Sequence, residues 1–505
     1  MNIVLIHPYI VVRTLDIYLS EPLGLLCLAT YIRQVFSEED VNVSILDLYA
    51  LGASSPTAKG DMYIKGVSCE ADIYRLLEAL KPDLIGVTCC FTGYFEEALD
   101  IARIAKKYYP STPVVMGGAH ATLEATNIMI NNSFVDYIVC NEGELTFEEL
   151  IKSLITKNNI DFASIHGLCW RDISGVILNE SRKLIENLDI LPIPDRRFID
   201  MEHYKKSNSV LFNFHKTAPL ATLMTSRGCP YECVFCCTKN MWKRKWRPIS
   251  LVKVFQEIEL LSNEYGIKEI CILDDQFIMK KDRIYSFCDY FIRSKKKFVF
   301  SNIAGISAWL ADDDNLLLKM RKAGFYKLTI PVESANKETL DFIKKPINLQ
   351  KISMLIKKAN KLGYWTGAFF IVGFPYENRK QIMETIDFAY NSEIDFAHFF
   401  VAQPYIGTEM YSVYEKEGLL KEPFNSGTYI FRGWHDTLSM KADELNDIVE
   451  NASSKWLLHK LFYFFRPNNW LNNLLPKISS IDRFSYSVRI FLMLLRRGIV
   501  ARRKK

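Results

Sequence analysis

Residues 225–240, TSRGCPYECVFCCTKN, hold four of the chain's twelve cysteines within nine positions. Cys229, Cys233 and Cys236 follow the spacing C-x-x-x-C-x-x-C, directly after residues that are typical of a strand. Three thiolates held this closely can bind three irons of a cubane cluster and leave the fourth iron open to a further ligand. A tetrahedral zinc site would need a fourth Cys or His, and the adjacent Cys237 cannot easily join the same tetrahedron. The triplet by itself leaves both kinds of site open.

Composition limits the classes of protein that the chain can belong to. Its 505 residues, 49% of them hydrophobic, can fill roughly two to four domain cores. Twelve cysteines over this length are unlike a small secreted scaffold, and the N-terminal residues MNIVLIHPYI show no export signal. We therefore expect a cytoplasmic protein with mostly free thiols. The net charge of +5 gives no reason to expect a nucleic-acid partner.

Residues 1–155 alternate short apolar runs with helical segments. The apolar runs are continuous, which is typical of parallel strands covered on both faces, and we expect a five-stranded α/β domain. Ligands of such sheets bind at the carboxyl ends of the strands. The loops at these ends supply the candidate binding residues His7, Pro8, Thr88, Thr92, Gly117, Gly118, His120, Glu142, Gly143 and Glu144.

A second series of βα units covers residues 221–404 and, with the strand before the cysteines, contains six predicted strands. This number predicts a partial β/α barrel, whose active site lies at the carboxyl ends of the strands. Residues 156–220 are irregular and are predicted to be a linker. Residues 405–505 are rich in aromatic residues and are predicted to be mainly helical, either as a packed core or as a cover over a substrate cavity.

The two halves resemble the two domains of one enzyme family. The segments EPLGLLCLATYIRQ, DLIGVT and VVMGGAHATLEATNIMINNSFVDYIVCNEGELTFEELI are similar to the cobalamin-binding domain that precedes many radical S-adenosylmethionine enzymes. Residues 221–404 resemble the radical S-adenosylmethionine core strand by strand. The fold that this implies is α/β: a Rossmann-like (flavodoxin-like) cobalamin domain, a partial (β/α)6 barrel and a mainly helical C-terminal region.

The resemblance also implies cofactors and contacts. It implies a 4Fe-4S cluster on Cys229, Cys233 and Cys236, with S-adenosyl-L-methionine on the remaining iron. In matching positions it places Phe235, Gly373 and Pro375 near adenine, Glu333 and Ser334 near ribose and carboxylate, Asp274 and Asp275 near the methionine amino group, and Gln403 in the sixth-strand motif. Asp274 or Asp275 could instead cap the following helix. For Cys237 we expect no chemical role.

One departure from related cobalamin proteins concerns the cobalt. The Asp-x-His-x-x-Gly segment that supplies a histidine ligand in cobalamin mutases is absent, and His7 and His120 stand in different contexts. The resemblance implies base-off cobalamin without a histidine ligand. For His120 we favour an ordinary loop position or a contact with the corrin edge.

The paired cofactors favour methylation of a carbon in a natural-product, peptide or lipid-like substrate, through a 5′-deoxyadenosyl radical and methylcobalamin. The alternative from the same family is an oxidative cyclase or rearrangement enzyme, and the cysteine triplet argues against a non-catalytic corrinoid carrier. The expected partners are a small-molecule or peptide substrate and an electron donor such as flavodoxin or ferredoxin. The basic end RRGIVARRKK could contact a membrane surface, but a packed helix with a solvated end is favoured.

Overall fold

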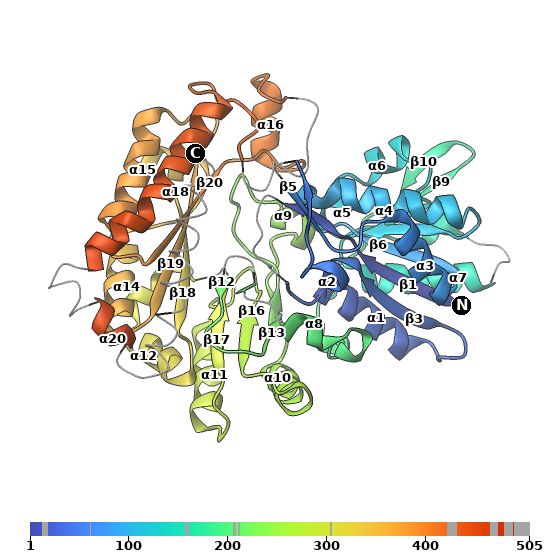
Figure 1. The fold of residues 1–505 in the computed structure, drawn as a ribbon, viewed down its shortest axis with the longest axis horizontal. Coiled ribbons are helices and arrows are strands. Elements are labelled where there is room, and N and C mark those ends of the chain that lie inside the picture. The colour runs from blue at the N-terminus through green and yellow to red at the C-terminus, as the bar shows by residue number, and fades with distance from the viewer. Residues whose placement is uncertain are drawn as a thin grey trace.

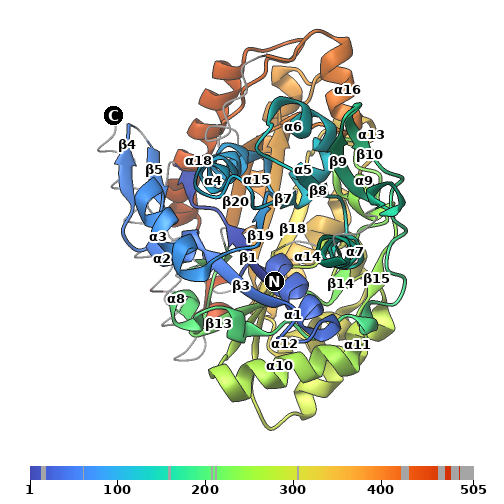
Figure 2. The same cartoon turned by 90° about the vertical axis from the view of Figure 1, so that its right-hand side faces the viewer.

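The computed structural model describes residues 1–12, 19–60, 62–156, 161–205, 209–210, 213–303, 306–421, 432–464, 473–478 and 488. Figure 1 shows an N-terminal domain, in blue to cyan, beside an open half-barrel in green to orange. In Figure 2 the N-terminal domain lies in front of the barrel strands. The basic C-terminal end lies outside the described residues. Within the described part of the chain, no helix combines the length and the apolar character needed to cross a membrane.

The N-terminal domain is built on one sheet of the order β10-β9-β8-β7-β6-β1-β3. Its five parallel strands are β1 (Asn2–His7), β3 (Asn42–Asp47), β6 (Leu84–Thr88), β7 (Val114–Gly117) and β8 (Tyr137–Val139). Their order is that of a flavodoxin-like sheet, which confirms the predicted fold. A hairpin, β9 (Leu168–Asp172) and β10 (Gly175–Leu178), pairs antiparallel with β8 and extends this sheet from the segment predicted to be a linker.

Helices cover both faces of this sheet, as its continuous apolar strands require. One face packs against α1 (Leu23–Val35) and α7 (Gly143–Thr156). The other packs against α3 (Glu70–Leu80), α4 (Phe95–Tyr108), α5 (Ala119–Leu123) and α6 (Ala125–Asn131). A smaller antiparallel sheet beside them contains β2 (Ile10–Val12), β4 (Thr57–Lys59) and β5 (Met62–Lys65), and α2 (Leu48–Gly52) follows β3.

The connection to the barrel contains α8 (Met201–Lys205) and the short pair β11 (Ser209–Val210) and β12 (Asn213–Phe214). The barrel has the six predicted parallel strands, in two sheets of three. They are β13 (Leu220–Leu223), β16 (Glu269–Ile272) and β17 (Val299–Asn302), followed by β18 (Lys327–Glu333), β19 (Trp365–Val372) and β20 (Phe396–Val401). A single parallel bridge, Phe300 to Phe325, joins the two sheets.

Helices on the outside of the barrel begin and end at ordinary capping residues. Ser250 caps α10 (Leu251–Tyr265), which ends at Gly266, and Asn378 forms a capping box with Gln381 at α15 (Arg379–Asn391). The other outer helices are α11 (Lys281–Arg293), α12 (Asp314–Ala323), α13 (Lys337–Phe342) and α14 (Leu349–Lys361). The described C-terminal residues form α16 (Glu409–Lys416), α18 (Ala442–Phe464) and α20 (Leu475–Ile478), in agreement with a mainly helical region.

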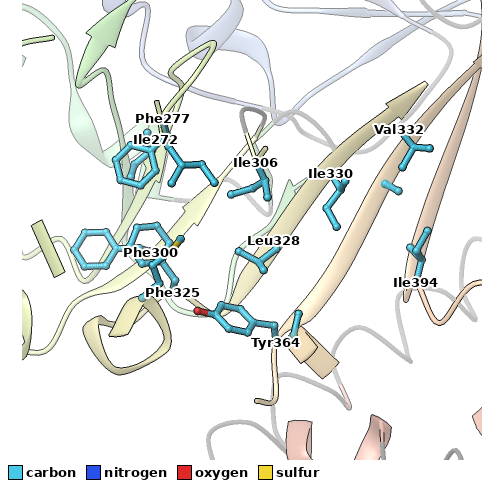
Figure 3. Close-up of a cluster of buried hydrophobic side chains, with 14 of the residues drawn as sticks. Ile272, Phe277, Phe300, Ile306, Phe325, Leu328, Ile330, Val332, Tyr364 and Ile394 are labelled. Carbon is cyan, nitrogen blue, oxygen red and sulfur yellow. The ribbon is translucent and has the colours of Figure 1, made fainter. Parts of the chain in front are cut away.

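The largest hydrophobic core lies between the barrel strands and the outer helices (Figure 3). It includes Leu328, Ile330 and Val332 of β18. Because side chains alternate along a strand, Thr329 and Pro331 face the opposite side, which is the lumen of the barrel. The same core continues into the N-terminal domain through Ile10, Val12, Leu19, Tyr49, Ala50 and Ala53. The two domains are therefore packed against each other and share buried residues.

Candidate functional site

A cavity of about 370 Å³ lies between the N-terminal domain and the barrel, at the carboxyl ends of the parallel strands. Its wall includes six of the residues predicted to bind a corrinoid: Thr88, Gly117, Gly118, Glu142, Gly143 and Glu144. The barrel half contributes Met224, Arg227, Met241, Trp242, Lys253 and Glu257, and α1 contributes Leu23, Gly24, Leu25, Cys27 and Leu28. The inner end, at Leu5, Val115 and Phe147, is apolar. One cavity thus joins the predicted corrinoid loops to the part of the chain that carries the cysteines.

Gly118 gives the strand-end loop its shape. Its φ is 106°, and a Cβ there would lie 2.7 Å from the carbonyl oxygen of Cys89. Any other residue would be strained in this conformation and would collide with the backbone. The loop therefore packs tightly against the backbone that follows β6.

His7 and His120 do not belong to this wall. His7 Nδ1 lies 2.9 Å from Asp47 Oδ1, and Tyr204 donates to the other carboxylate oxygen at 2.5 Å. Burial alone would lower the pKa of His7, but the Asp47 carboxylate outweighs it and the pKa is raised. His120 Nδ1 lies 3.1 Å from Thr92 Oγ1, and burial lowers the pKa of His120 to about 4. Both rings are held inside the N-terminal domain, as is Thr92; Pro8, which follows β1, is also absent from the wall.

The three cysteines of the loop are free thiols that interact with one another. Burial, together with the neighbouring Cys236, Asp275 and Cys233, raises the pKa of Cys229 to about 11. Among the described residues, no three His, Cys, Asp or Glu side chains converge on a single metal ion. A donor set of three free, mutually interacting thiols on one loop fits a cluster that takes one sulfur per iron.

Two neighbouring aspartates hold the loop in different ways. Asp274 is buried, and its two oxygens accept three hydrogen bonds of 2.5–2.6 Å from Thr225 and Ser226. Asp275 lies near the Gly228 backbone and the Trp242 side chain, which both lower the pKa of its carboxyl group. Burial, together with the adjacent Asp274, raises the pKa of Asp275 to about 6. Asp274 therefore anchors the strand end, whereas Asp275 lies beside the cysteine loop.

Glu333, at the end of β18, has a φ of 62°, which is rare for a residue with a side chain. Its Oε1 accepts a hydrogen bond of 2.9 Å from Lys345 Nζ, and this ammonium also interacts with Cys233 and Cys236. Ser334 is buried, with its Oγ 3.1 Å from Thr385 Oγ1. Sequence reasoning missed Lys345; the adjacent lysines of the turn IKKPIN, residues 343–348, were the available sign.

The remaining predicted contacts surround the same end of the barrel. The ring centroids of Phe235 and Phe374 are 5.9 Å apart. Gly373 has a φ of 80°, and a Cβ there would lie 2.9 Å from Leu445 Cδ1 of α18. Pro375 accepts the backbone N–H of Leu438 at 3.2 Å. Gln403 Nε2 donates to the Arg432 backbone carbonyl at 2.8 Å. The buried Oε1 of Gln403 has no hydrogen-bond partner among the described residues.

The chain matches two family models in chain order. Residues 17–151 match the B12 binding domain, and residues 223–389 match the radical SAM superfamily. An uncharacterized methyltransferase of Pyrococcus horikoshii is 33% identical over 391 residues, which are 77% of this chain and 77% of that protein. The chain belongs to the cobalamin-binding radical S-adenosylmethionine family. Its cofactors are those of this family, namely cobalamin, S-adenosylmethionine and a 4Fe-4S cluster.

One further curated protein is similar to this radical S-adenosylmethionine protein in sequence, and two solved structures are similar in fold. Cytidylyl-2-hydroxyethylphosphonate methyltransferase of Streptomyces wedmorensis is 28% identical over 419 residues, covering 77% of each chain. The structure of OxsB with aqua-cobalamin and S-adenosylmethionine bound superimposes with a TM-score of 0.68 at 17% identity, over 98% of this chain and 72% of that one. The structure of TsrM from Kitasatospora setae, with tryptophan substrate and a SAM analog bound, gives a TM-score of 0.64 at 16% identity, over 84% of this chain and 78% of that one.

Proposed function

We propose that the protein methylates a carbon centre of a natural-product, peptide or lipid-like small molecule. The observation that carries this proposal is the cavity between the two domains, whose wall contains both the corrinoid loops and Arg227, two residues before Cys229. A methyl carrier next to a radical generator solves the alkylation of a carbon that has no nucleophilic lone pair. The methyltransferase names of the relatives from Pyrococcus horikoshii and Streptomyces wedmorensis support the same reaction class.

When bound, cobalamin supplies the methyl group, and S-adenosylmethionine with the cluster supplies the radical that removes hydrogen from the substrate. Cys229, Cys233 and Cys236 hold the cluster. Asp275 and Glu333 lie at strand ends beside the cysteine loop, where carboxylates would bind the amino group and ribose of S-adenosylmethionine. An electron donor such as flavodoxin or ferredoxin would reduce the cluster.

The corrinoid would occupy the interdomain cavity. Its glycine-lined loops let a flat ring approach the backbone, and its apolar inner end, between the sheet and α1 and α7, suits an aromatic nucleotide base. The polar groups Arg227, Lys253 and Glu257 lie on the barrel side of the same wall and Glu144 on the N-terminal side, where they would contact amide side chains.

The substrate would enter the lumen of the barrel. Phe370 and Phe399 belong to the outer core, so the alternating Phe369, His398 and Phe400 face the lumen. The Phe369 ring lies 5.5 Å from the His398 ring and 5.9 Å from the Phe400 ring, and all three side chains are half-buried. This aromatic wall supports a substrate with an apolar or conjugated surface.

A second function is favoured by other relatives. Anaerobic magnesium-protoporphyrin IX monomethyl ester cyclase of Rubrivivax gelatinosus is 26% identical over 403 residues, covering 78% of this chain and 69% of that protein. An oxidative cyclase or a rearrangement enzyme would use the same cofactors without net transfer of a methyl group.

Product analysis distinguishes the two functions. Compounds are first screened for stimulation of 5′-deoxyadenosine formation, and the active compound is then incubated with methyl-labelled S-adenosylmethionine. Methylation requires label in the product, together with both 5′-deoxyadenosine and S-adenosylhomocysteine. A product that is isomeric with the substrate or has lost hydrogens, formed without S-adenosylhomocysteine, would assign the chain to the cyclase class. The Cys236→Ala variant serves as the control, because without a cluster it should form none of these products.

A further inference from the structure

Arg227 links the cysteine loop to the N-terminal domain through two ion pairs. Its Nη1 donates to Glu142 Oε1 at 2.7 Å, and its Nη2 donates to Glu144 Oε1 at 2.7 Å. The side chains of Arg227, Glu142 and Glu144 are 10%, 4% and 6% exposed. Glu142 lies in the loop after β8 and Glu144 in the first turn of α7, and both form part of the cavity wall. A planar guanidinium that binds one carboxylate with each terminal nitrogen fixes distance and direction together.

A second arginine reaches the same loop from the barrel side. Arg247 Nη1 donates to Glu142 Oε2 at 2.8 Å and to the Ile185 carbonyl at 2.5 Å, and its guanidinium carbon lies 5.6 Å from the Trp242 ring centroid. Arg227 and Arg247 belong to the paired strands β14 (Ser226–Arg227) and β15 (Arg247–Pro248). Two cations thus face two carboxylates across the domain boundary in a buried, charge-balanced group.

This group continues to the cysteine loop by two routes. Along the backbone, Arg227 is followed by Gly228 and then by Cys229. Through side chains, the Arg247 guanidinium lies over the Trp242 ring, and Trp242 in turn lies near the Asp275 carboxylate. Gly228 has a φ of 95°, and any Cβ there would overlap the Lys245 backbone, so the loop has little freedom to adjust. A shift of the loop at 142–144 would therefore move the residues that carry the cluster.

We propose that Arg227 is a positioning residue that couples the corrinoid loop to the cysteine loop, so that cobalamin and S-adenosylmethionine bind cooperatively. Each ligand orders one side of the shared ion-pair group, and the second ligand then meets a site that is already in place. Coupling of this kind is reciprocal, and typical values in proteins are about 5–150-fold. The inference rests on the proposed use of both cofactors.

The test measures cobalamin affinity of the full-length, cluster-loaded protein with and without S-adenosylmethionine, under anaerobic conditions. The wild-type protein should bind hydroxocobalamin at least about 5-fold more tightly when S-adenosylmethionine is present. In Arg227→Met this ratio should fall to about one, whatever the affinity of the variant for cobalamin alone. Arg227→Lys, which cannot bind both carboxylates in the same plane, should give an intermediate ratio.

Two further variants separate coupling from loss of structure. Removing Arg227 alone leaves two carboxylates buried, so the charge-balanced double variant Arg227→Met/Glu144→Gln is measured as well. The ratio of cobalamin affinities with and without S-adenosylmethionine should also be about one in this double variant. Arg182→Met is the matched control, because Arg182 pairs with Glu149 on α7 but does not contact the cysteine loop. It should keep the wild-type ratio.

A ratio of one in the wild-type protein, or a wild-type ratio in Arg227→Met and in the charge-balanced pair, would overturn the coupling. If Arg227→Met does not fold, the charge-balanced pair decides. Failure of the wild-type protein to bind any corrinoid would instead remove the proposed function, which keeps the two failures distinct. Electron paramagnetic resonance of the reduced cluster gives an independent readout: S-adenosylmethionine should perturb the spectrum of Arg227→Met equally with and without cobalamin.

Discussion

Asp274 and Thr225 are joined by two hydrogen bonds of 2.6 Å, one from the backbone N–H and one from the hydroxyl of Thr225. This carboxylate is fully occupied within the barrel, because Ser226 donates to it as well. The next residue, Asp275, instead faces Gly228 and Trp242. The two adjacent aspartates therefore have different expected roles, one in shaping the loop and one beside the cofactor.

The variants Asp274→Asn and Asp275→Asn should separate these roles. In Asp274→Asn an amide donor replaces an acceptor, so a buried donor on Thr225 or Ser226 loses its partner at a cost of about 1–3 kcal/mol. This variant should unfold at lower urea concentration and load less iron. Asp275→Asn should keep its stability and its cluster but bind S-adenosylmethionine more weakly, measured by equilibrium dialysis. Equal effects of both changes on stability would contradict the assignment.

The cysteine assignment predicts a clear pattern of iron content. Cys229→Ala, Cys233→Ala and Cys236→Ala should each abolish the 4Fe-4S cluster after anaerobic reconstitution, because a cubane held by two protein thiolates is poorly retained. Cys237→Ala should load a full cluster and cleave S-adenosylmethionine reductively. Iron analysis and the visible absorption of the cluster measure both. Loss of iron in the Cys237 variant equal to that in the other three would overturn the choice of ligands.

The sequence predicted the local elements of the fold better than its long-range contacts. Continuous apolar runs identified the five parallel strands, and the six barrel strands followed from the same pattern. The hairpin at β9 and β10 was missed because LCWRD ends in two charged residues and GVIL has only four residues. The pairing of Arg227 with Glu144 depends on how two domains dock, and no local pattern encodes it.

Gly373 illustrates a second limit of prediction from sequence. The family motif explains this glycine by a base that lies against the backbone, whereas the space beside it holds Leu445 of the C-terminal helix α18. Gly373→Ala should cost about 1–3 kcal/mol of stability, from the positive φ and from the collision. A double-mutant cycle with Leu445→Ala, followed by urea denaturation, should give a coupling of at least about 0.5 kcal/mol. If the coupling is zero and the only effect of Gly373→Ala is weaker binding of S-adenosylmethionine, the adenine contact would be supported instead.

Glu97 makes the stability of the N-terminal domain depend on pH. This side chain is 4% exposed, its Oε2 has no hydrogen-bond partner among the described residues, and burial raises its pKa to about 7 from a usual value of 4.5. Because the folded state favours the protonated form, the contribution of Glu97 to stability is present below pH 4.5 and is lost as the pH rises to about 7.

Glu97→Gln removes this dependence, so the variant should match the wild-type protein at about pH 4 and exceed its stability by up to about 3 kcal/mol at about pH 8. Urea denaturation at the two pH values measures the difference. Glu96→Gln, an exposed neighbour on the same helix, is the control and should show no such trend. A stability gain for Glu97→Gln that does not grow with pH would contradict the buried-acid explanation.

The last prediction concerns the cobalt ligand. His7 is held by Asp47, and His120 is held by Thr92 with its Nε2 buried, so neither imidazole can reach the cavity without breaking these contacts. We therefore expect cobalamin to bind with its dimethylbenzimidazole displaced and with no protein imidazole on cobalt. The paramagnetic resonance spectrum of the cob(II)alamin form should lack superhyperfine splitting from an axial nitrogen, and His7→Ala and His120→Ala should leave it unchanged. Nitrogen splitting that disappears in one of these variants would identify that histidine as the ligand, and splitting that survives in both would point to the dimethylbenzimidazole.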